Sequence, residues 1–141
     1  FKIDGDEYGP MGVRVGHVLP LLSTATGRVF LSWLPAEQTG QLVEQERSSS
    51  VSLAGNFDAR IRDATIVDIA KDVRRDGIAR TDSAMSGGFS AASAPVFDQM
   101  RQLCAAITTL GPEPDDTAGA QFEEALRNTA DELSRRLGAP R

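Results

Sequence analysis

Side chains able to carry out acyl transfer gather in one stretch of the chain, residues 88–112, which reads GFSAASAPVFDQMRQLCAAITTLGP. Its two serines, Ser90 and Ser93, would need a base to accept the hydroxyl proton, and His17 is the only histidine of the sequence. Neither serine lies in a G-x-S-x-G motif, and a lone histidine in a predicted strand more often has a structural role. A small serine hydrolase that uses Ser90 or Ser93 with His17 is therefore kept as the alternative interpretation.

The other chemically capable residues occur in patterns that favour structural roles. Cys104 lies in the apolar run LCAAIT and is expected to be a buried, unreactive thiol, because its strand carries no Arg, Lys or His. The glycines at 87–88 lack the lysine and the spacing of a phosphate-binding loop. The acidic pairs at 115–116 and 123–124 are expected to be solvated. We therefore predict no catalytic residue, no metal site and no cofactor.

A helix start offers a different chemistry, the capture of an anion by backbone amides. Residues 23–27 read Ser-Thr-Ala-Thr-Gly and open a predicted helix, with Ser23 or Thr24 as the N-cap. The N–H groups of a first turn have no partner within the helix, so they attract a carboxylate or a phosphate without a cationic side chain. Gly27 would let another group approach the backbone, or would merely pack against the sheet; the residues alone leave both open.

Hydrophobic periodicity and breaker residues predict the elements that would position this helix start. Helices are predicted over Ser23–Leu34, Pro35–Arg47, Ala64–Asp76 and Thr117–Leu137. Strands are predicted over Gly12–Leu19, Phe89–Phe97 and Leu103–Leu110, with a short extended segment at Ile78–Thr81. Helices that lie between and after antiparallel strands favour an α+β fold, in which helices cover a sheet.

Single residues add detail to these elements. Pro95 cannot donate to a strand ladder, which places it at a sheet edge or beside a bulge. Gly77 is expected to end its helix in the left-handed conformation. The last helix is expected to bury one apolar stripe, made of Phe122, Leu126, Ala130, Leu133 and Leu137.

Composition limits the classes of function. The chain has 141 residues, enough for one domain, and a formal net charge of −5, so it lacks the basic field that holds a nucleic-acid backbone. A single cysteine excludes an internal disulfide, and no apolar run reaches the roughly 18 to 20 residues that span a bilayer. We expect a cytoplasmic protein that makes no membrane contact. Its abrupt start, Phe1–Tyr8, predicts that the chain is the middle of something larger.

Three segments, considered together with their order and spacing, resemble one known family. They are Pro20–Pro35 (PLLSTATGRVFLSWLP), Val73–Ala79 (VRRDGIA) and Ala94–Pro112 (APVFDQMRQLCAAITTLGP). They are similar to the T-A-x-G-[KR] helix start, the R-x-x-G-[YI]-A turn and the A-P-[VI]-[FY]-D strand of the effector-binding domain of IclR-type bacterial transcriptional regulators. The resemblance covers about residues 13–137.

The resemblance implies a fold and a role. Members of this family join an N-terminal winged-helix DNA-binding domain to an effector domain with a curved antiparallel sheet of the GAF/profilin type, flanked by helices. The effector domain binds a small metabolite, often an organic or aromatic acid, and helps to form dimers or tetramers. Residues 1–141 are thus expected to be a single effector-binding domain truncated at its N-terminus. Its first strand or strands and the DNA-binding domain, the one part that would contact DNA, would lie outside this chain.

The resemblance also implies the ligand contacts. The ligand carboxylate would meet backbone N–H groups at the helix start, formed by Ala25, Thr26 and Gly27. Side-chain contacts fall on Thr81, Ala91, Thr108 and Leu110, with Asp82 adjacent and able to substitute. Further walls are expected from Phe30, Trp33, Met85 and Phe89.

The sequence departs from family members that bind glyoxylate or pyruvate. In those members the first two side-chain positions are Asp and Cys and the last two are Ser, whereas this chain has the less polar or smaller Thr81, Ala91 and Leu110. A larger or more apolar acid, such as an aromatic acid, would suit this lining better. An oligomerisation module with a vestigial pocket stays open as a further interpretation.

Overall fold

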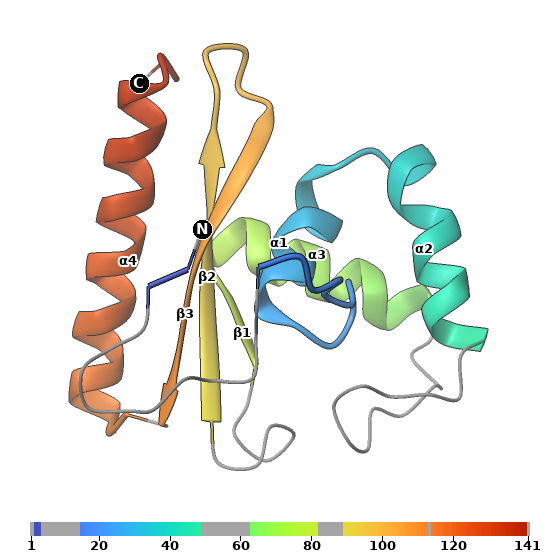
Figure 1. Cartoon of the computed structure of the whole chain (residues 1–141), viewed down its shortest axis with the longest axis horizontal. Coiled ribbons are helices and arrows are strands. Elements are labelled where there is room, and N and C mark those ends of the chain that lie inside the picture. The colour runs from blue at the N-terminus through green and yellow to red at the C-terminus, as the bar shows by residue number, and fades with distance from the viewer. Residues whose placement is uncertain (1, 4–14, 49–62, 82–88, 113, 141) are drawn as a thin grey trace.

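The computed structural model describes residues 2–3, 15–48, 63–81, 89–112 and 114–140. Within them the helices are α1 (Ala25–Trp33), α2 (Ala36–Ser48), α3 (Asp63–Asp76) and α4 (Asp116–Arg136). The strands are β1 (Ala79–Thr81), β2 (Phe89–Phe97) and β3 (Leu103–Pro112). Helix α4 covers one face of the sheet, while α1 and α3 lie on its other side and α2 lies farthest out (Figure 1). The predicted α+β class, an antiparallel sheet flanked by helices, is confirmed.

The sheet of the described residues has the order β1-β2-β3, and both of its pairs are antiparallel. The predicted hairpin is present, and Asp98 Oδ1 closes its turn by accepting the N–H groups of Met100 and Gln102 at 2.8 and 3.0 Å. Pro95 lies beyond the stretch of β2 that pairs with β1, and beside the register shift at Val96. The prediction of an edge or a bulge at Pro95 is confirmed on both counts.

Strand alternation divides the core between the two faces of the sheet, because neighbouring side chains on a strand point to opposite sides. On the α4 face the buried residues are Ile78, Ala94, Val96, Leu126 and Ala130. On the α1 face they are Ala25, Val29, Val73 and Ala79. A third cluster under α2 is made of Leu22, Leu31 and Val43. Since burial of one valine or leucine side chain contributes about 1.5–3 kcal/mol, these clusters fix how the helices sit on the sheet.

The helix ends agree with the sequence to within one or two residues. Thr24 is the N-cap of α1, and its side chain accepts the N–H of Gly27. Gly77 follows α3 with φ 67°, and its N–H bonds the carbonyl of Val73 at 2.9 Å, as expected of a left-handed C-cap. Of the helices in the described part of the chain, none combines the length and the apolar character that crossing a membrane demands.

The strand predicted over Gly12–Leu19 is wrong over its described residues. Residues 15 and 16 form a turn in which Gly16 adopts φ 93°, and residues 17–20 are irregular. Val15 and Val18 are 77% and 87% exposed rather than half-buried. Alternating valines favour a strand only where a neighbouring strand and a core cover one face, and a left-handed glycine interrupts the extended run. Residues 12–14 lie outside the described part.

The apolar stripe predicted for α4 is also partly wrong. Leu126 and Ala130 are buried, but the line continues to Ser134 and not to Leu133. The remaining members, Phe122, Leu133 and Leu137, are 53%, 37% and 45% exposed. Ser134 tolerates burial because its hydroxyl donates to the carbonyl of Ala130 and accepts the N–H of Phe97. A satisfied polar residue thus sets the face that α4 turns to the sheet.

Candidate functional site

The start of α1 is built by its cap. Thr24 has an extended backbone, and its hydroxyl donates to the carbonyl of Pro20 at 2.7 Å while accepting the N–H of Gly27 at 2.9 Å. No acceptor for the N–H groups of Ala25 and Thr26 lies among the described residues. Ala25 is buried and Thr26 is half-buried, so Thr26 is the more open of the two. These two amides are the ones expected to hold a carboxylate.

Three hydroxyl groups form a chain beside this helix start. The Oγ1 atoms of Thr26 and Thr108 lie 2.6 Å apart, and Thr108 Oγ1 lies 2.8 Å from Ser93 Oγ. Three hydroxyl protons serve two internal bonds, so one proton remains for an outside acceptor. Ser93 is fully buried, and its proton is satisfied if it donates to Thr108 and Thr108 donates to Thr26. That direction leaves the remaining proton on Thr26, next to its N–H.

The predicted side-chain positions on the three strands lie in one row. Thr81 is opposite Ala91 in the β1–β2 pair, and Ala91 is opposite Leu110 in the β2–β3 pair. Ala91 packs against the cluster that contains Ala25, so the row lies on the α1 face. Thr81 is 8% exposed and Leu110 is 38% exposed. The structure therefore brings the helix start, Thr108 and this row to one side of the sheet.

The four residues expected to form further walls of the pocket lie in different parts of the structure. Phe89 begins β2 two residues before Ala91, hence on the same face, and is 39% exposed. Phe30 is half-buried on α1. Trp33 ends α1, about 10 Å along the axis from Thr26, and its ring meets that of Phe97 edge to face at 5.6 Å. It therefore lies at the other end of the helix. Asp82 and Met85 fall outside the described residues.

Gly27 has a packing role that the sequence left open. A Cβ at this position would lie 2.1 Å from the carbonyl oxygen of Pro20 and 2.5 Å from the Cα of Leu21. The absent side chain thus lets the helix approach the preceding loop, not the sheet. Its N–H is taken by the cap, so Gly27 positions the first turn rather than offering a donor of its own.

Two charged side chains that sequence reasoning missed hold this loop in place. Glu46 of α2 accepts the N–H groups of Leu21 and Leu22, the latter at 3.0 Å. Arg28 donates from Nε to the carbonyl of Leu22 at 2.9 Å and from Nη1 to the carbonyl of Arg80 at 2.7 Å. Nothing in the local sequence signals the contacts of Glu46 with Leu21 and of Arg28 with Arg80, because the partners are 25 and 52 positions apart.

A charged network ties β1 to α3 and α4. Arg80 binds Glu123 through two bonds of 2.5 and 2.6 Å and reaches Asp76 at 3.2 Å, and Arg127 meets Glu123 at 3.1 Å. The hydrogen bond from Arg80 lowers the pKa of the Glu123 carboxyl, and the one from Arg75 lowers the pKa of Asp76. The same pairing with Glu123 raises the pKa of Arg80. The last residue of α3 and the middle of α4 are thereby fixed relative to the sheet.

The expected burial of Cys104 is wrong. Cys104 is exposed, because β3 is the outer strand of the described sheet and several of its positions remain open to solvent. The thiol donates to the carbonyl of Val96 at 3.4 Å. Among the described residues there is no group of three His, Cys, Asp or Glu side chains placed to hold a metal ion.

The elements of the alternative hydrolase lie in different surroundings. His17 is exposed in the irregular segment that precedes α1. The hydroxyl of Ser93 is hydrogen-bonded to that of Thr108, and Ser90 lies opposite Gly111 in the β2–β3 pair.

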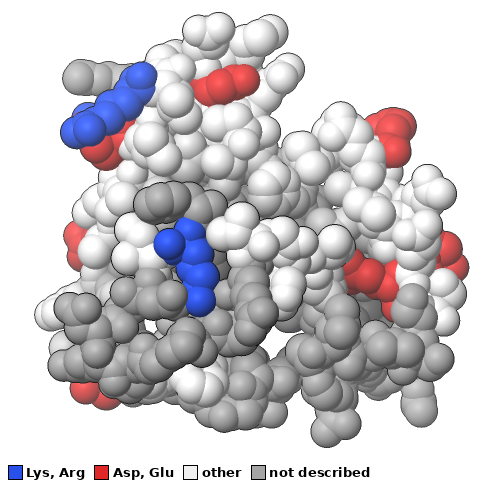
Figure 2. Space-filling view, viewed as in Figure 1, with Lys and Arg blue, Asp and Glu red and all other residues white. Residues whose placement is uncertain are grey.

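On the face seen in Figure 2 the charged residues are few and scattered, with no basic patch over the described residues.

Residues 2–135 match the family model described as bacterial transcriptional regulator IclR C-terminal. The HTH-type transcriptional regulator XynR of Escherichia coli K12 is 29% identical over 141 residues, which are 99% of this chain and 54% of that protein. The chain therefore spans about half the length of the curated relatives it matches.

Two solved structures share the fold. Pseudomonas aeruginosa HmgR gives a TM-score of 0.74 at 30% identity and covers 90% of this chain and 49% of its own. The inducer-binding domain of a PobR double mutant from Acinetobacter, solved as a complex with 3-hydroxybenzoic acid, gives a TM-score of 0.70 at 23% identity. This match covers 92% of this chain and 74% of that one.

Proposed function

The chain belongs to the IclR-type bacterial transcriptional regulators, matching their C-terminal domain, and from this premise we propose that it binds a small organic acid as its effector. The observation that carries the proposal is the hydroxyl chain of Ser93, Thr108 and Thr26, which ends beside the N–H of Thr26. A carboxylate at this position accepts both the amide and the hydroxyl proton of Thr26. The positive end of the α1 dipole adds to this attraction.

The residues around this anchor favour an apolar acid over a small keto acid. Ala91 and Leu110 occupy the row next to Thr108, and Phe89 lies on the same face near its end. Such side chains offer contact area but no hydrogen bond to a second carboxylate or a keto group. The complex of the PobR domain with 3-hydroxybenzoic acid supports an aromatic acid as a ligand that this fold accommodates. We propose that the ligand here is aromatic or comparably apolar.

Regulation follows from linkage between this site and the rest of the full-length protein. We propose that residues 1–141 form one effector-binding and oligomerisation domain of a dimer or tetramer, with operator contacts made by a DNA-binding domain outside it. The effector then shifts operator affinity only as far as its own affinity differs between two conformational states. Such a regulator would work in the cytoplasm, where the DNA is.

A matched pair of threonines tests the site. Thr108 and Thr109 are neighbours on β3 that face opposite sides of the sheet, and the Thr109 hydroxyl reaches the carbonyl of Ala92 instead. In calorimetric titrations with benzoate, Thr108→Val is expected to raise Kd by up to about tenfold, because the Thr26 hydroxyl loses the neighbour that turns its proton toward the carboxylate, and a neutral hydrogen bond contributes about 0.5–1.5 kcal/mol. Thr109→Val should bind like the wild type.

Three outcomes contradict the proposal. One is equal loss of benzoate binding in both variants, which would show that Thr108 has no special role. Another is tight binding of pyruvate while benzoate and fatty acids fail, which would refute the apolar ligand. If no organic acid binds, the interpretation as an oligomerisation module with a vestigial pocket replaces this one.

A further inference from the structure

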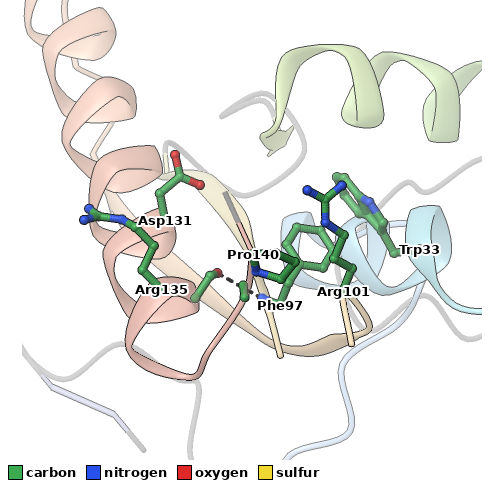
Figure 3. A pocket seen from close by; sticks show the side chains of 8 residues that line it. Trp33, Phe97, Arg101, Asp131, Arg135 and Pro140 are labelled. Atoms are coloured by element: carbon green, nitrogen blue, oxygen red, sulfur yellow. Dashed lines mark hydrogen bonds between the residues drawn. The ribbon is translucent and has the colours of Figure 1, made fainter. Parts of the chain in front are cut away.

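A cavity of about 530 Å³ opens at the end of the sheet opposite to the helix start. Its walls come from Trp33 at the end of α1, Phe97 at the end of β2, the hairpin residue Arg101, and the last turns of α4 with the tail that follows (Figure 3). Phe97 lies six positions after Ala91 on β2, a distance of about 20 Å along an extended strand. The cavity is therefore separate from the candidate effector site.

The lining combines an aromatic floor with a cationic rim. The Trp33 and Phe97 rings pack edge to face, with an angle of 69° between their planes, and Pro140 lies close to Phe97 in Figure 3. Arg135 and Arg101 line the same cavity, and Asp131 is the acidic residue among its walls. Cavities of about 300–1,000 Å³ with apolar walls and a few placed polar groups are typical of small-molecule sites.

We propose that this cavity is a second ligand site, which takes a one- or two-ring aromatic carboxylate. The ring stacks on the Trp33 and Phe97 side chains, and the carboxylate accepts hydrogen bonds from the guanidinium of Arg101, which points toward these rings in Figure 3. The guanidinium of Arg135 turns away from the rings and pairs with Glu132 at 2.5 Å. Asp131 repels a second negative charge, so a monoanion is preferred over a dicarboxylate.

The backbone around the cavity holds its walls in unusual conformations. Arg101 has φ 58°, the left-handed region that glycine or asparagine adopts at lower cost, and this conformation points its side chain to the cavity. The tail after α4 turns back at Gly138, where a Cβ would lie 3.2 Å from Gln99, and the N–H of Ala139 bonds the carbonyl of Ser134. This turn brings Pro140 over the cavity.

The sequence supplies a site-specific reporter, because Trp33 is its only tryptophan. The full chain, labelled with ¹⁵N, gives one indole N–H peak, and titration with 2-naphthoate should shift that peak in a saturable way. Titration with 2-naphthalenemethanol, which has the rings without the charge, should shift it at least about tenfold more weakly.

Two arginines provide the variant and its control. Arg101 lines the cavity beside the two rings, whereas Arg136 pairs with Glu132 at 2.9 Å and is not one of the cavity walls. Arg101→Gly should raise the Kd for 2-naphthoate about tenfold or more, because it removes the guanidinium and suits the left-handed backbone, while Arg136→Ala leaves the Kd unchanged. The Thr108→Val variant, which weakens binding at the effector site, should leave the Trp33 response intact.

The outcomes separate this proposal from the preceding one. Equal affinity in the Arg101→Gly and Arg136→Ala variants overturns the second site. Loss of the Trp33 response in Thr108→Val also overturns it, because the peak would then report binding at the helix start. A Trp33 peak that moves with protein concentration and not with 2-naphthoate would show that this face contacts a second copy of the chain instead.

Discussion

Substitution of Gly27 by alanine tests the packing that creates the helix start. The new methyl group would lie 2.1 Å from the oxygen of Pro20, and 2.5 and 2.7 Å from the Cα and oxygen of Leu21, where contacts of about 3.5–4 Å are normal. All three are backbone atoms, and Glu46 holds the Leu21 amide, so the loop cannot yield by changing a rotamer. Overpacking of this kind costs about 1–3 kcal/mol, and we expect about 2 kcal/mol after the gain in helix propensity.

Gly40 provides the matched control. It lies inside α2, and a Cβ there would meet nothing within 4 Å. Gly40→Ala should therefore stabilise the protein by about 0.5–1 kcal/mol, the helix-propensity difference alone. In urea unfolding, with an m-value of about 2 kcal/mol/M, the midpoint of Gly27→Ala falls by about 1 M while that of Gly40→Ala rises. Equal or rising midpoints for both variants would refute the close approach of α1 to the loop.

Three further predictions follow from other contacts. Pairing lowers the pKa of Glu123, so the stabilisation from its ion pair is present above the unfolded value near 4.5 and is lost as the pH falls below it. Between pH 7 and 3.5 the urea midpoint should therefore drop more steeply in the wild type than in Glu123→Gln. The control Glu124→Gln should follow the wild type. Arg101→Gly should raise the melting temperature by a few degrees, since it relieves about 1 kcal/mol of left-handed strain, and an unchanged or lower value would contradict that strain. Cys104 should react with iodoacetamide in the native protein within minutes, and protection until unfolding would contradict its exposure.

The sequence predicted most of the fold because local signals were consistent over long segments. Caps, periodicity and breakers placed α1, α4 and the hairpin within a residue or two. The strand predicted over Gly12–Leu19 is wrong over residues 15–19, because alternation predicts a strand only if another strand and a core complete it. Ser134 displaced Leu133 from the buried line of α4 because its hydroxyl found two partners, which hydropathy alone does not anticipate.

The candidate site could be predicted in part for a similar reason. The helix start is a local feature, so the sequence alone predicts Thr24 as a candidate N-cap and Thr26 as part of the first turn. The hydroxyl of Ser93 joins this site only through the register of β2 against β3, which the sequence does not reveal. From the sequence alone, Ser93 is a candidate nucleophile and not a member of a binding site. Glu46 and Arg28 contact residues that are 25 and 52 positions away, which no local pattern encodes.

The most direct measurement of the central claim is an amide NMR titration of the ¹⁵N-labelled chain with benzoate, followed at Ala25 and Thr26. We predict large, saturable shifts of the Thr26 amide and smaller ones of Ala25, both saturating at a higher benzoate concentration in Thr108→Val and at the wild-type concentration in Thr109→Val. A titration in which these two amides stay still while benzoate binds elsewhere would contradict the claim that the start of α1 holds the effector.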